Sequence, residues 1–211
     1  MHWGGIFLKM VGKKRVRIIK KKESCCDYYK ESWGYIKESK KYIYSIASVF
    51  LVFGILGFIF PIFFVEPIKI LIKQLLEQTN ELNTFSLVWF IFLNNLKTSF
   101  VGLALGILFG FIPVTLTIVN GYVLGFVSNY AVKNAGFSSL FRLLPHGIFE
   151  LPAVIIGLGL GTKLGMFFFS KNSDKEFMRR LVLSLKVFIF VIIPLLIIAA
   201  IIEGSLIGLL K

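Results

Sequence analysis

The sequence predicts an all-α fold: a polytopic transmembrane helical bundle of about five spans, with an amphipathic helix at the membrane interface. Two observations lead to this fold class. Hydrophobic residues make up 56% of the 211-residue chain, and its mean hydropathy is +0.81. Several apolar runs also contain about 18 residues or more, the length at which a helix crosses roughly 30 Å of hydrocarbon. The composition therefore outweighs the length, which alone would suggest one or two soluble domains.

Residues 1–41 are expected to form a basic, partly amphipathic cytoplasmic segment, and residues 42–211 the transmembrane helical domain. The first segment holds 12 of the 24 Lys and Arg residues of a chain whose formal net charge is +13. Beside a membrane span, such charge favours anionic lipid headgroups over nucleic acid, because each cation near an anionic surface contributes about 1 kcal/mol. We therefore expect the lipid bilayer as a partner and no nucleic acid.

The second half of this basic segment alternates aromatic and charged residues. We expect it either to lie in the interface as a helix or to form a short helix after a disordered tail. In the interfacial helix, four aromatic residues would lie at headgroup level: Tyr28, Tyr29, Trp33 and Tyr35. Cys25 and Cys26 are adjacent, an arrangement that rarely meets disulfide geometry, so they are expected to be free thiols.

The five spans are expected over residues 42–65, 85–112, 113–132, 146–169 and 181–202. Residues 66–83 are too polar to span, yet their apolar residues recur at helical spacing. This pattern predicts an amphipathic helix that lies on the membrane or caps the bundle. Only a short connection separates the second span from Pro113, so the second and third spans are expected to form an antiparallel hairpin.

The fifth span is preceded by a helix start and contains a helix distortion. Ser173 and Glu176 match a capping box, which predicts that a helix begins there. Pro194 lies inside the span and predicts a kink, because proline lacks the backbone N–H that the helix ladder needs.

Glycines within the spans predict close helix packing. A spacing of four residues returns a helix to nearly the same face, so such glycines form a smooth stripe against which another backbone can lie. The expected packing glycines are Gly102, Gly106, Gly110, Gly121, Gly125, Gly157, Gly161 and Gly165. The run GLGLG at 157–161 lies in an apolar helix and is therefore interpreted as packing sequence rather than a nucleotide-binding loop.

The distribution of Lys and Arg between the predicted loops gives an orientation. With a cytoplasmic N-terminus, the inside segments hold 16 of these cations and the outside segments 5. Positive charge is enriched on the cytoplasmic side of membrane proteins. We therefore expect a multi-pass protein of the cell membrane, with the N-terminus inside and the C-terminus outside.

The central stretch, residues 142–165, reads RLLPHGIFELPAVIIGLGLGTKLG and places ionisable residues beside membrane-type sequence. Pro145 and Pro152 are predicted helix breaks. His146 and Glu150 lie four residues apart and would share a helical face. Glu150 needs a partner or a function, because an unpaired carboxylate in hydrocarbon is costly.

Two interpretations of Glu150 stay open. In the first it joins a buried polar cluster that ties three spans together, with His146 and the polar residues Asn94, Asn95, Lys97 and Asn120. In the second, Glu150 and His146 belong to an ion or proton path along a broken helix. Two ligands are too few for a metal site, and no catalytic triad, HExxH motif or Walker loop is present. No metal, cofactor or enzymatic activity is therefore expected.

The words NGYVLG at 120–125 and PHGIFELPA at 145–153, followed by GLGLGTKLG, resemble the stage II sporulation protein M family. The resemblance covers roughly residues 45–202 and leaves out the basic N-terminus. It implies a membrane protein of about five spans. Members from sporulating bacteria act with peptidoglycan-degrading partners during engulfment, and the family also occurs in organisms that do not sporulate, archaea included.

The expected function is a non-enzymatic scaffold or partner subunit in a membrane or cell-envelope complex. Its expected partners are membrane or envelope proteins and further copies of the chain. The alternative is a small oligomeric ion channel or transporter whose pathway includes Glu150 and His146. The two differ in whether the polar residues of the spans line a continuous water-accessible route.

Overall fold

A computed structural model describes residues 25–80, 82–142, 144–170 and 172–210, almost all of which are helical and none of which forms a strand. This confirms the all-α fold class. The α-helices are α1 (Cys25–Glu38), α2 (Lys40–Ile59), α3 (Val65–Asn80), α4 (Thr84–Ala104), α5 (Phe111–Ala135), α6 (Leu144–Gly165), α7 (Ser173–Val187) and α8 (Ile193–Leu210). The 3-10 helices are η1 (Leu105–Ile107), η2 (Phe137–Arg142) and η3 (Met166–Phe169), and η4 (Phe188–Ile192) is a π-helix.

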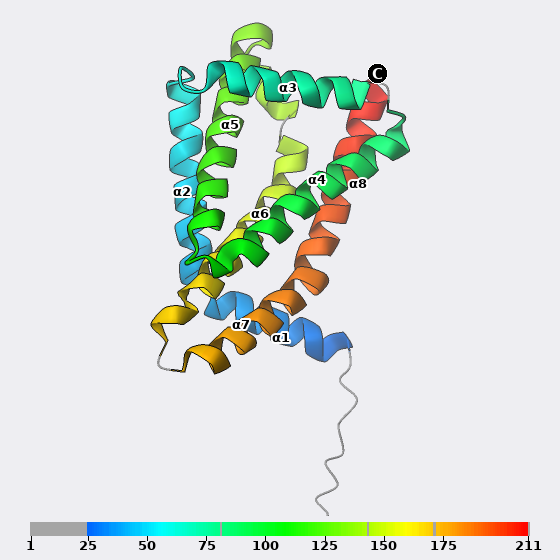
Figure 1. The fold of residues 1–211 in the computed structure, drawn as a ribbon. Helices are drawn as coiled ribbons and strands as arrows, with labels where there is room; N and C mark the ends of the chain where they lie inside the picture. The colour runs from blue at the N-terminus through cyan, green and yellow to red at the C-terminus, as the bar shows by residue number, and fades with distance from the viewer. Residues whose placement is uncertain (1–24, 81, 143, 171, 211) are drawn as a thin grey trace, which may run out of the picture.

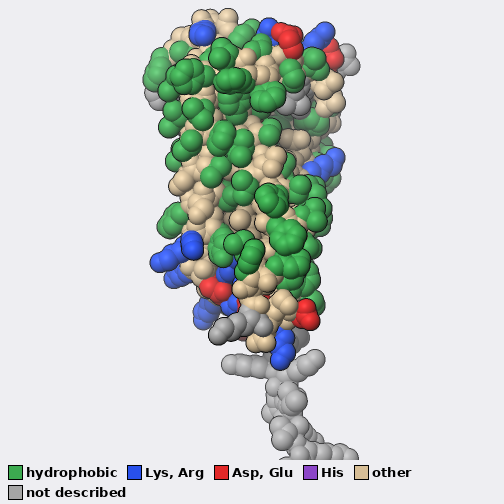
Figure 2. Space-filling view, turned by 60° about the vertical axis from the view of Figure 1, so that its left-hand side comes forward, with side chains coloured by type: hydrophobic (Ala, Val, Ile, Leu, Met, Phe, Trp, Pro, Cys, Tyr) green, Lys and Arg blue, Asp and Glu red, His purple; other side chains and the backbone are tan. Residues whose placement is uncertain are grey.

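Five helical segments are long and apolar enough to cross a membrane, which confirms the expected number of spans. They are Lys40–Ile59, Thr84–Ile107, Phe111–Ala135, Gly147–Phe169 and Ser173–Ser205. Helix α3 lies across one end of the bundle, and α1 and α7 lie at the other end (Figure 1). Figure 2 shows the charged side chains gathered mainly near these two ends, with hydrophobic side chains over the body between them.

Helix α6 is the central element of the bundle. In the most apolar stretch of the span that contains α6, 56% is buried, against 17% in the corresponding stretch of the α2 span. Pro145 lies in the first turn of α6, where a missing N–H costs little. The prediction of a break at Pro152 is wrong, because α6 continues through this residue. One proline removes a single ladder hydrogen bond, and the packing of α6 against its neighbours keeps the helix continuous.

Helices α2 and α5 pack so closely that glycine is required at their contact. A Cβ atom added at Gly125 would lie 2.0 Å from the carbonyl oxygen of Gly54, and one at Gly57 would lie 2.2 Å from that of Tyr122. A Cβ at Gly121 would meet the carbonyl oxygen of Phe50 at 2.6 Å. Such an approach gives van der Waals contact between backbones without side-chain ordering.

The same geometry joins α6 to α4, which holds Gly102, and to η1, which holds Gly106. A Cβ at Gly106 would lie 2.1 Å from the carbonyl oxygen of Gly161, and one at Gly161 would lie 2.2 Å from that of Gly102. Gly165 would meet Gly106 in the same way, whereas Gly157 makes only ordinary contacts, at 3.4 Å from Ser99. The contact is therefore tightest over the last two turns of α6.

The turn between α4 and α5 differs from the predicted hairpin. The second span ends in η1, and Gly110 then adopts a left-handed conformation with φ of 74°, which only glycine adopts without strain. From this turn α4 and α5 diverge, and α5 lies along α2 (Figure 1). The prediction that spans two and three pair is wrong, because the glycine faces of α2 and α5 decide the packing and the short connection does not.

Helices α7 and α8 form one long continuous helix through the π-helix η4. Pro194 is the second residue of α8, just after η4, and cannot donate a ladder hydrogen bond, so the predicted distortion takes the form of a π-helical turn. The predicted helix start is correct, since α7 begins at Ser173. The capping box is wrong: the N-cap is Asn172 with no side-chain bond, and the Glu176 carboxylate instead accepts from Arg180.

Candidate functional site

The polar residues expected around Glu150 are not gathered into one dry cluster. Asn94 and Lys97 are exposed on α4, and Asn95 is half-buried. Asn120 donates to the carbonyl oxygen of Leu116 in its own helix, at 2.7 Å. The α4 side chains that were expected to close on Glu150 therefore lie partly at the outer surface of the bundle.

Glu150 is half-buried in α6 and already makes an interaction within the protein. His146 is in the first turns of the same helix, and its side chain lies outside the described residues. Among the described residues, no group of three His, Cys, Asp or Glu side chains could hold a metal ion. A role for Glu150 and His146 in an ion path stays a prediction.

A charged cluster that the sequence analysis missed lies at the end of the bundle formed by α1 and α7. Its centre is Lys163 near the end of α6, which is only 5% exposed. The Lys163 ammonium donates to the Glu38 carboxylate at 2.9 Å and to the Ser39 hydroxyl at 3.0 Å. It also lies 4.0 Å from the centre of the Tyr35 ring, a cation–π contact. The cation thus has polar or aromatic partners from the junction of α1 and α2.

Glu38 joins three elements through one carboxylate. Besides Lys163 of α6, it accepts two hydrogen bonds from the Arg179 guanidinium of α7, at 3.1 and 2.5 Å. These charge-assisted bonds lower the pKa of the Glu38 carboxyl, with Arg179 the largest cause and Lys163 acting in the same direction. Glu38 therefore ties the end of α1 to both α6 and α7.

Arg180 covers the end of α6. Its guanidinium donates to the carbonyl oxygen of Lys163 and to the Ser170 hydroxyl, both at 2.9 Å, and to Glu176 at 3.1 Å. Cations near a helix C-terminus satisfy free carbonyl groups and oppose the negative end of the helix dipole. We call the set Tyr35, Glu38, Ser39, Lys163, Glu176, Arg179 and Arg180 the anchor cluster.

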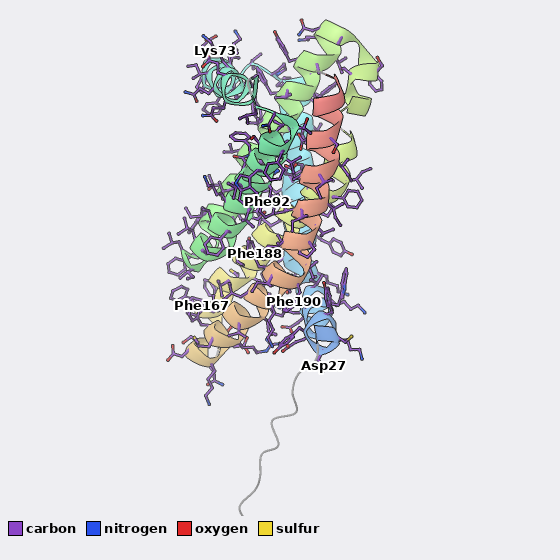
Figure 3. The ribbon with its side chains drawn as sticks, turned by 90° about the vertical axis from the view of Figure 1, so that its right-hand side faces the viewer. Asp27, Lys73, Phe92, Phe167, Phe188 and Phe190 are labelled. Carbon is purple, nitrogen blue, oxygen red and sulfur yellow. The ribbon has the colours of Figure 1, made fainter. Side chains whose placement is uncertain are left out.

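Aromatic contacts extend the attachment of α1. Lys186 pairs with Glu31 at 2.5 Å, and the Tyr28 ring stacks on Phe190 with centroids 5.3 Å apart. Figure 3 shows Phe190 beside the end of the bundle marked by Asp27, far from Lys73 of α3. Helix α1 is therefore fixed to the α7–η4 segment by charge and ring contacts.

The expectation for Tyr35 is wrong. Expected at headgroup level, it is 2% exposed inside the bundle, and burial raises the pKa of its hydroxyl to about 12. Tyr29 and Trp33 are exposed on the same helix, and their place at headgroup level stays a prediction. The error arose because aromatic residues in α1 face two directions and the sequence does not say which face meets α7.

One sequence signal pointed to the anchor cluster. Lys163 is the one charged residue between Glu150 and Lys171, in an otherwise apolar helix. A cation in such a position requires a named partner, because its burial is costly without one. The surrounding glycines indicate helix packing and give no sign of an ion pair, and Glu38 lies 125 residues away in sequence.

Comparison with known proteins adds the family. The sequence profile described as "Stage II sporulation protein M" matches residues 46–206, most of the chain. The chain belongs to the stage II sporulation protein M family. The match starts inside α2 and includes Lys163, Arg179 and Arg180, so three cations of the anchor cluster lie in the family region while α1 and Glu38 precede it.

This family member is also similar to Uncharacterized protein MJ0706 of Methanocaldococcus jannaschii, with 31% identity over 148 residues. The aligned region is 67% of this chain and 62% of the relative's length. No solved structure matches the chain. The family and the five apolar helices together identify a membrane protein.

Proposed function

We propose that this stage II sporulation protein M family protein is a non-enzymatic scaffold or partner subunit in a membrane or cell-envelope complex. The observation that carries the proposal is the close glycine packing of α2 on α5 and of α4 on α6. Backbones in contact leave no room for a solute between these helices. Polar side chains of α4 face outward, where another protein can meet them.

The anchor cluster supports a binding role at one end of the bundle. It holds α1 against α6 and α7, and α1 presents Tyr29 and Trp33 at its surface, 44% and 52% exposed. Aromatic side chains on a rigid helix provide contact area at low entropic cost. This end of the molecule is a platform for membrane headgroups or for a partner protein.

The orientation belongs to the same proposal. We place the N-terminus and the α1–α7 end in the cytoplasm, and α3 and the C-terminus outside, from the distribution of Lys and Arg. Residues 1–24, which carry much of the basic charge, lie outside the described residues. We propose that this basic segment binds anionic lipid headgroups.

An oligomeric channel or transporter is the second candidate, and one observation favours it. Asn94 and Lys97 are exposed within a span, and several copies could turn these residues toward a shared water-filled path. Glu150 and His146 would then take part in conduction. This candidate requires ion flux that depends on an ionisable side chain at residue 150.

Native mass spectrometry of the full-length protein, tagged and released from its own cell membranes in mild detergent, tests the scaffold proposal. The expected result is a stoichiometric complex with at least one other chain, heavier than the 23.9 kDa monomer. The matched control is an equally tagged, unrelated five-span protein from the same membranes, which should not carry that chain. A monomer or a pure homo-oligomer in every preparation would contradict the proposal.

A further inference from the structure

Lys97 occupies an unusual place for a cation. It lies in the membrane-spanning segment Thr84–Ile107, 13 residues from its start and 10 from its end, or about 20 and 15 Å along the helix axis. Figure 3 shows Phe92, one and a half turns earlier, between the two charged ends of the molecule. The Lys97 side chain is nevertheless exposed, so in the isolated chain it faces hydrocarbon.

Within the described part of the chain, the Lys97 ammonium has no hydrogen bond or ion pair. This contrasts with Lys163, whose charge is compensated by Glu38. Ionisable residues in spans usually face the interior or a partner group because hydrocarbon does not solvate them. No described residue provides such a group for Lys97, which favours one from outside this chain.

The surface around Lys97 has the form of a helix interface. Four exposed residues of α4, Phe85, Trp89, Lys97 and Val101, and exposed Leu105 of η1 follow one another at multiples of four residues along a ridge that winds around the helix, with half-buried Leu93 between Trp89 and Lys97. Asn94, also exposed, lies one turn before Lys97 beside this ridge. An amide and an ammonium on an apolar ridge provide polar contacts across a helix pair. We call this ridge, with Asn94, the α4 ridge.

A second copy of this chain does not supply the missing charge. A two-fold interface on the α4 ridge would bring two Lys97 side chains toward each other. Among the described residues, the exposed carboxylates lie in α1, α3 and α7, at the ends of the bundle. Glu150 and Glu203, which lie within spans, are half-buried and already engaged. Among the described residues, no carboxylate therefore matches Lys97 across such an interface, which favours a different protein as the source of the complementary group.

We propose that the α4 ridge docks a transmembrane helix of a partner protein that carries a carboxylate side chain at the depth of Lys97. The proposal rests on the scaffold function above and specifies its partner. The partner's carboxylate pairs with Lys97, Asn94 forms a hydrogen bond to the same partner helix, and the aromatic residues of the ridge pack around these contacts. In low-dielectric surroundings this pairing gives both affinity and register.

A defined peptide tests the charge complementarity. The full-length protein, with Cys25→Ser and a fluorophore on the exposed thiol of Cys26, is reconstituted in neutral-lipid liposomes. Labelled polyleucine helices of about 22 residues, long enough to span, carry a central Glu, Gln or Leu. Energy transfer measures their association. The Glu peptide should associate about tenfold more tightly than the Gln or Leu peptide.

Substitutions assign the effect to Lys97. Lys97→Met should reduce association of the Glu peptide to that of the Gln peptide, and Lys97→Glu should instead prefer a Lys-centred peptide. The matched control is Lys69→Met, since Lys69 is an exposed cation of α3, and it should change nothing. Because Lys97 is exposed, these variants should keep the melting temperature of the parent. Equal association of the three peptides, or no effect of Lys97→Met, overturns the proposal.

Two further measurements separate this inference from the scaffold function. A single cysteine at residue 97 should resist a water-soluble thiol reagent in liposomes. Rapid labelling would indicate a water-filled path and would contradict both the docking inference and the scaffold function. Energy transfer can also be measured between labelled copies of this chain. If such transfer occurs and Lys97→Met abolishes it, the α4 ridge joins copies of this chain and the inference is overturned. If the liposome assay shows no preference for the Glu peptide but native mass spectrometry still finds the stoichiometric complex, this inference is overturned and the scaffold proposal stands.

Discussion

Lys163 and Glu38 form an ion pair whose two members have different surroundings. The Lys163 side chain is 6% exposed and that of Glu38 is 43% exposed. A buried charge that loses its partner is strongly destabilising, whereas a half-exposed charge can turn to water. The two single substitutions should therefore have unequal effects.

Glu38→Gln should lower stability more than Lys163→Met. The first leaves a buried ammonium without an anion, at a cost of about 3 kcal/mol, whereas after the second Glu38 keeps Arg179 and we expect roughly 1 kcal/mol. Thermal unfolding in detergent measures both. The double variant should recover much of the loss of Glu38→Gln, and a double variant as unstable as the sum of the two would contradict the pairing.

The same carboxylate gives a pH dependence. Arg179 lowers the pKa of Glu38 below its unfolded value of about 4.3, so the stabilisation is complete above that value. It is lost as the pH falls through the lower, folded-state pKa. As the pH is lowered below about 5, the melting temperature of the parent should therefore drop more steeply than that of Glu38→Gln. Parallel profiles for the two proteins would show that Glu38 carries no such stabilisation.

At the scale of the helices, glycine packing and helix propensity make opposite predictions. Alanine favours a helix over glycine by about 1 kcal/mol. At Gly106, however, the new Cβ would lie 2.1 Å from a carbonyl oxygen of α6, while at Gly34 of α1 nothing lies within 4 Å. Gly34 is therefore a matched control.

Gly106→Ala should destabilise the protein and Gly34→Ala should leave it unchanged or stabilise it slightly, as measured by melting temperature in one detergent. Overpacking of this kind costs about 1–3 kcal/mol, which outweighs propensity. If both alanine variants gained stability, helix propensity would dominate and the close contact of α4 with α6 would not hold in solution.

At the scale of the whole molecule, the orientation is open to a direct test. Single cysteines at Lys175 of α7 and Glu77 of α3 lie at opposite ends of the bundle, in a background without Cys25 and Cys26. In intact cells, an impermeant thiol reagent should label residue 77 and reach residue 175 only after permeabilisation. The reverse pattern would invert the proposed topology.

Local patterns in the sequence were sufficient for the spans and for α3. Apolar length and helical periodicity are local properties, and they placed these elements near their bounds, but the first two spans end earlier than expected, at Ile59 and Ile107, and the last segment starts earlier, at Ser173. Partnerships between helices could not be predicted in this way. The choice of α2 rather than α4 as the partner of α5 depends on which glycine faces meet, a non-local property.

The anchor cluster escaped prediction for the same reason. Lys163 and Glu38 are far apart in sequence, and each alone is an ordinary charged residue. Asn94 and Lys97 were expected inside the bundle because intramembrane polar residues usually face inward. Both are exposed on α4 instead, which makes the outer surface of this helix a candidate contact surface.

We propose that this bundle acts by binding other molecules and conducts nothing. The most direct measurement is ion flux across liposomes that contain the full-length protein, beside protein-free liposomes and the variants Glu150→Gln and Glu77→Gln. We expect all four preparations to leak equally, with the three proteins equally folded. Flux through the parent that Glu150→Gln abolishes and Glu77→Gln preserves would contradict it.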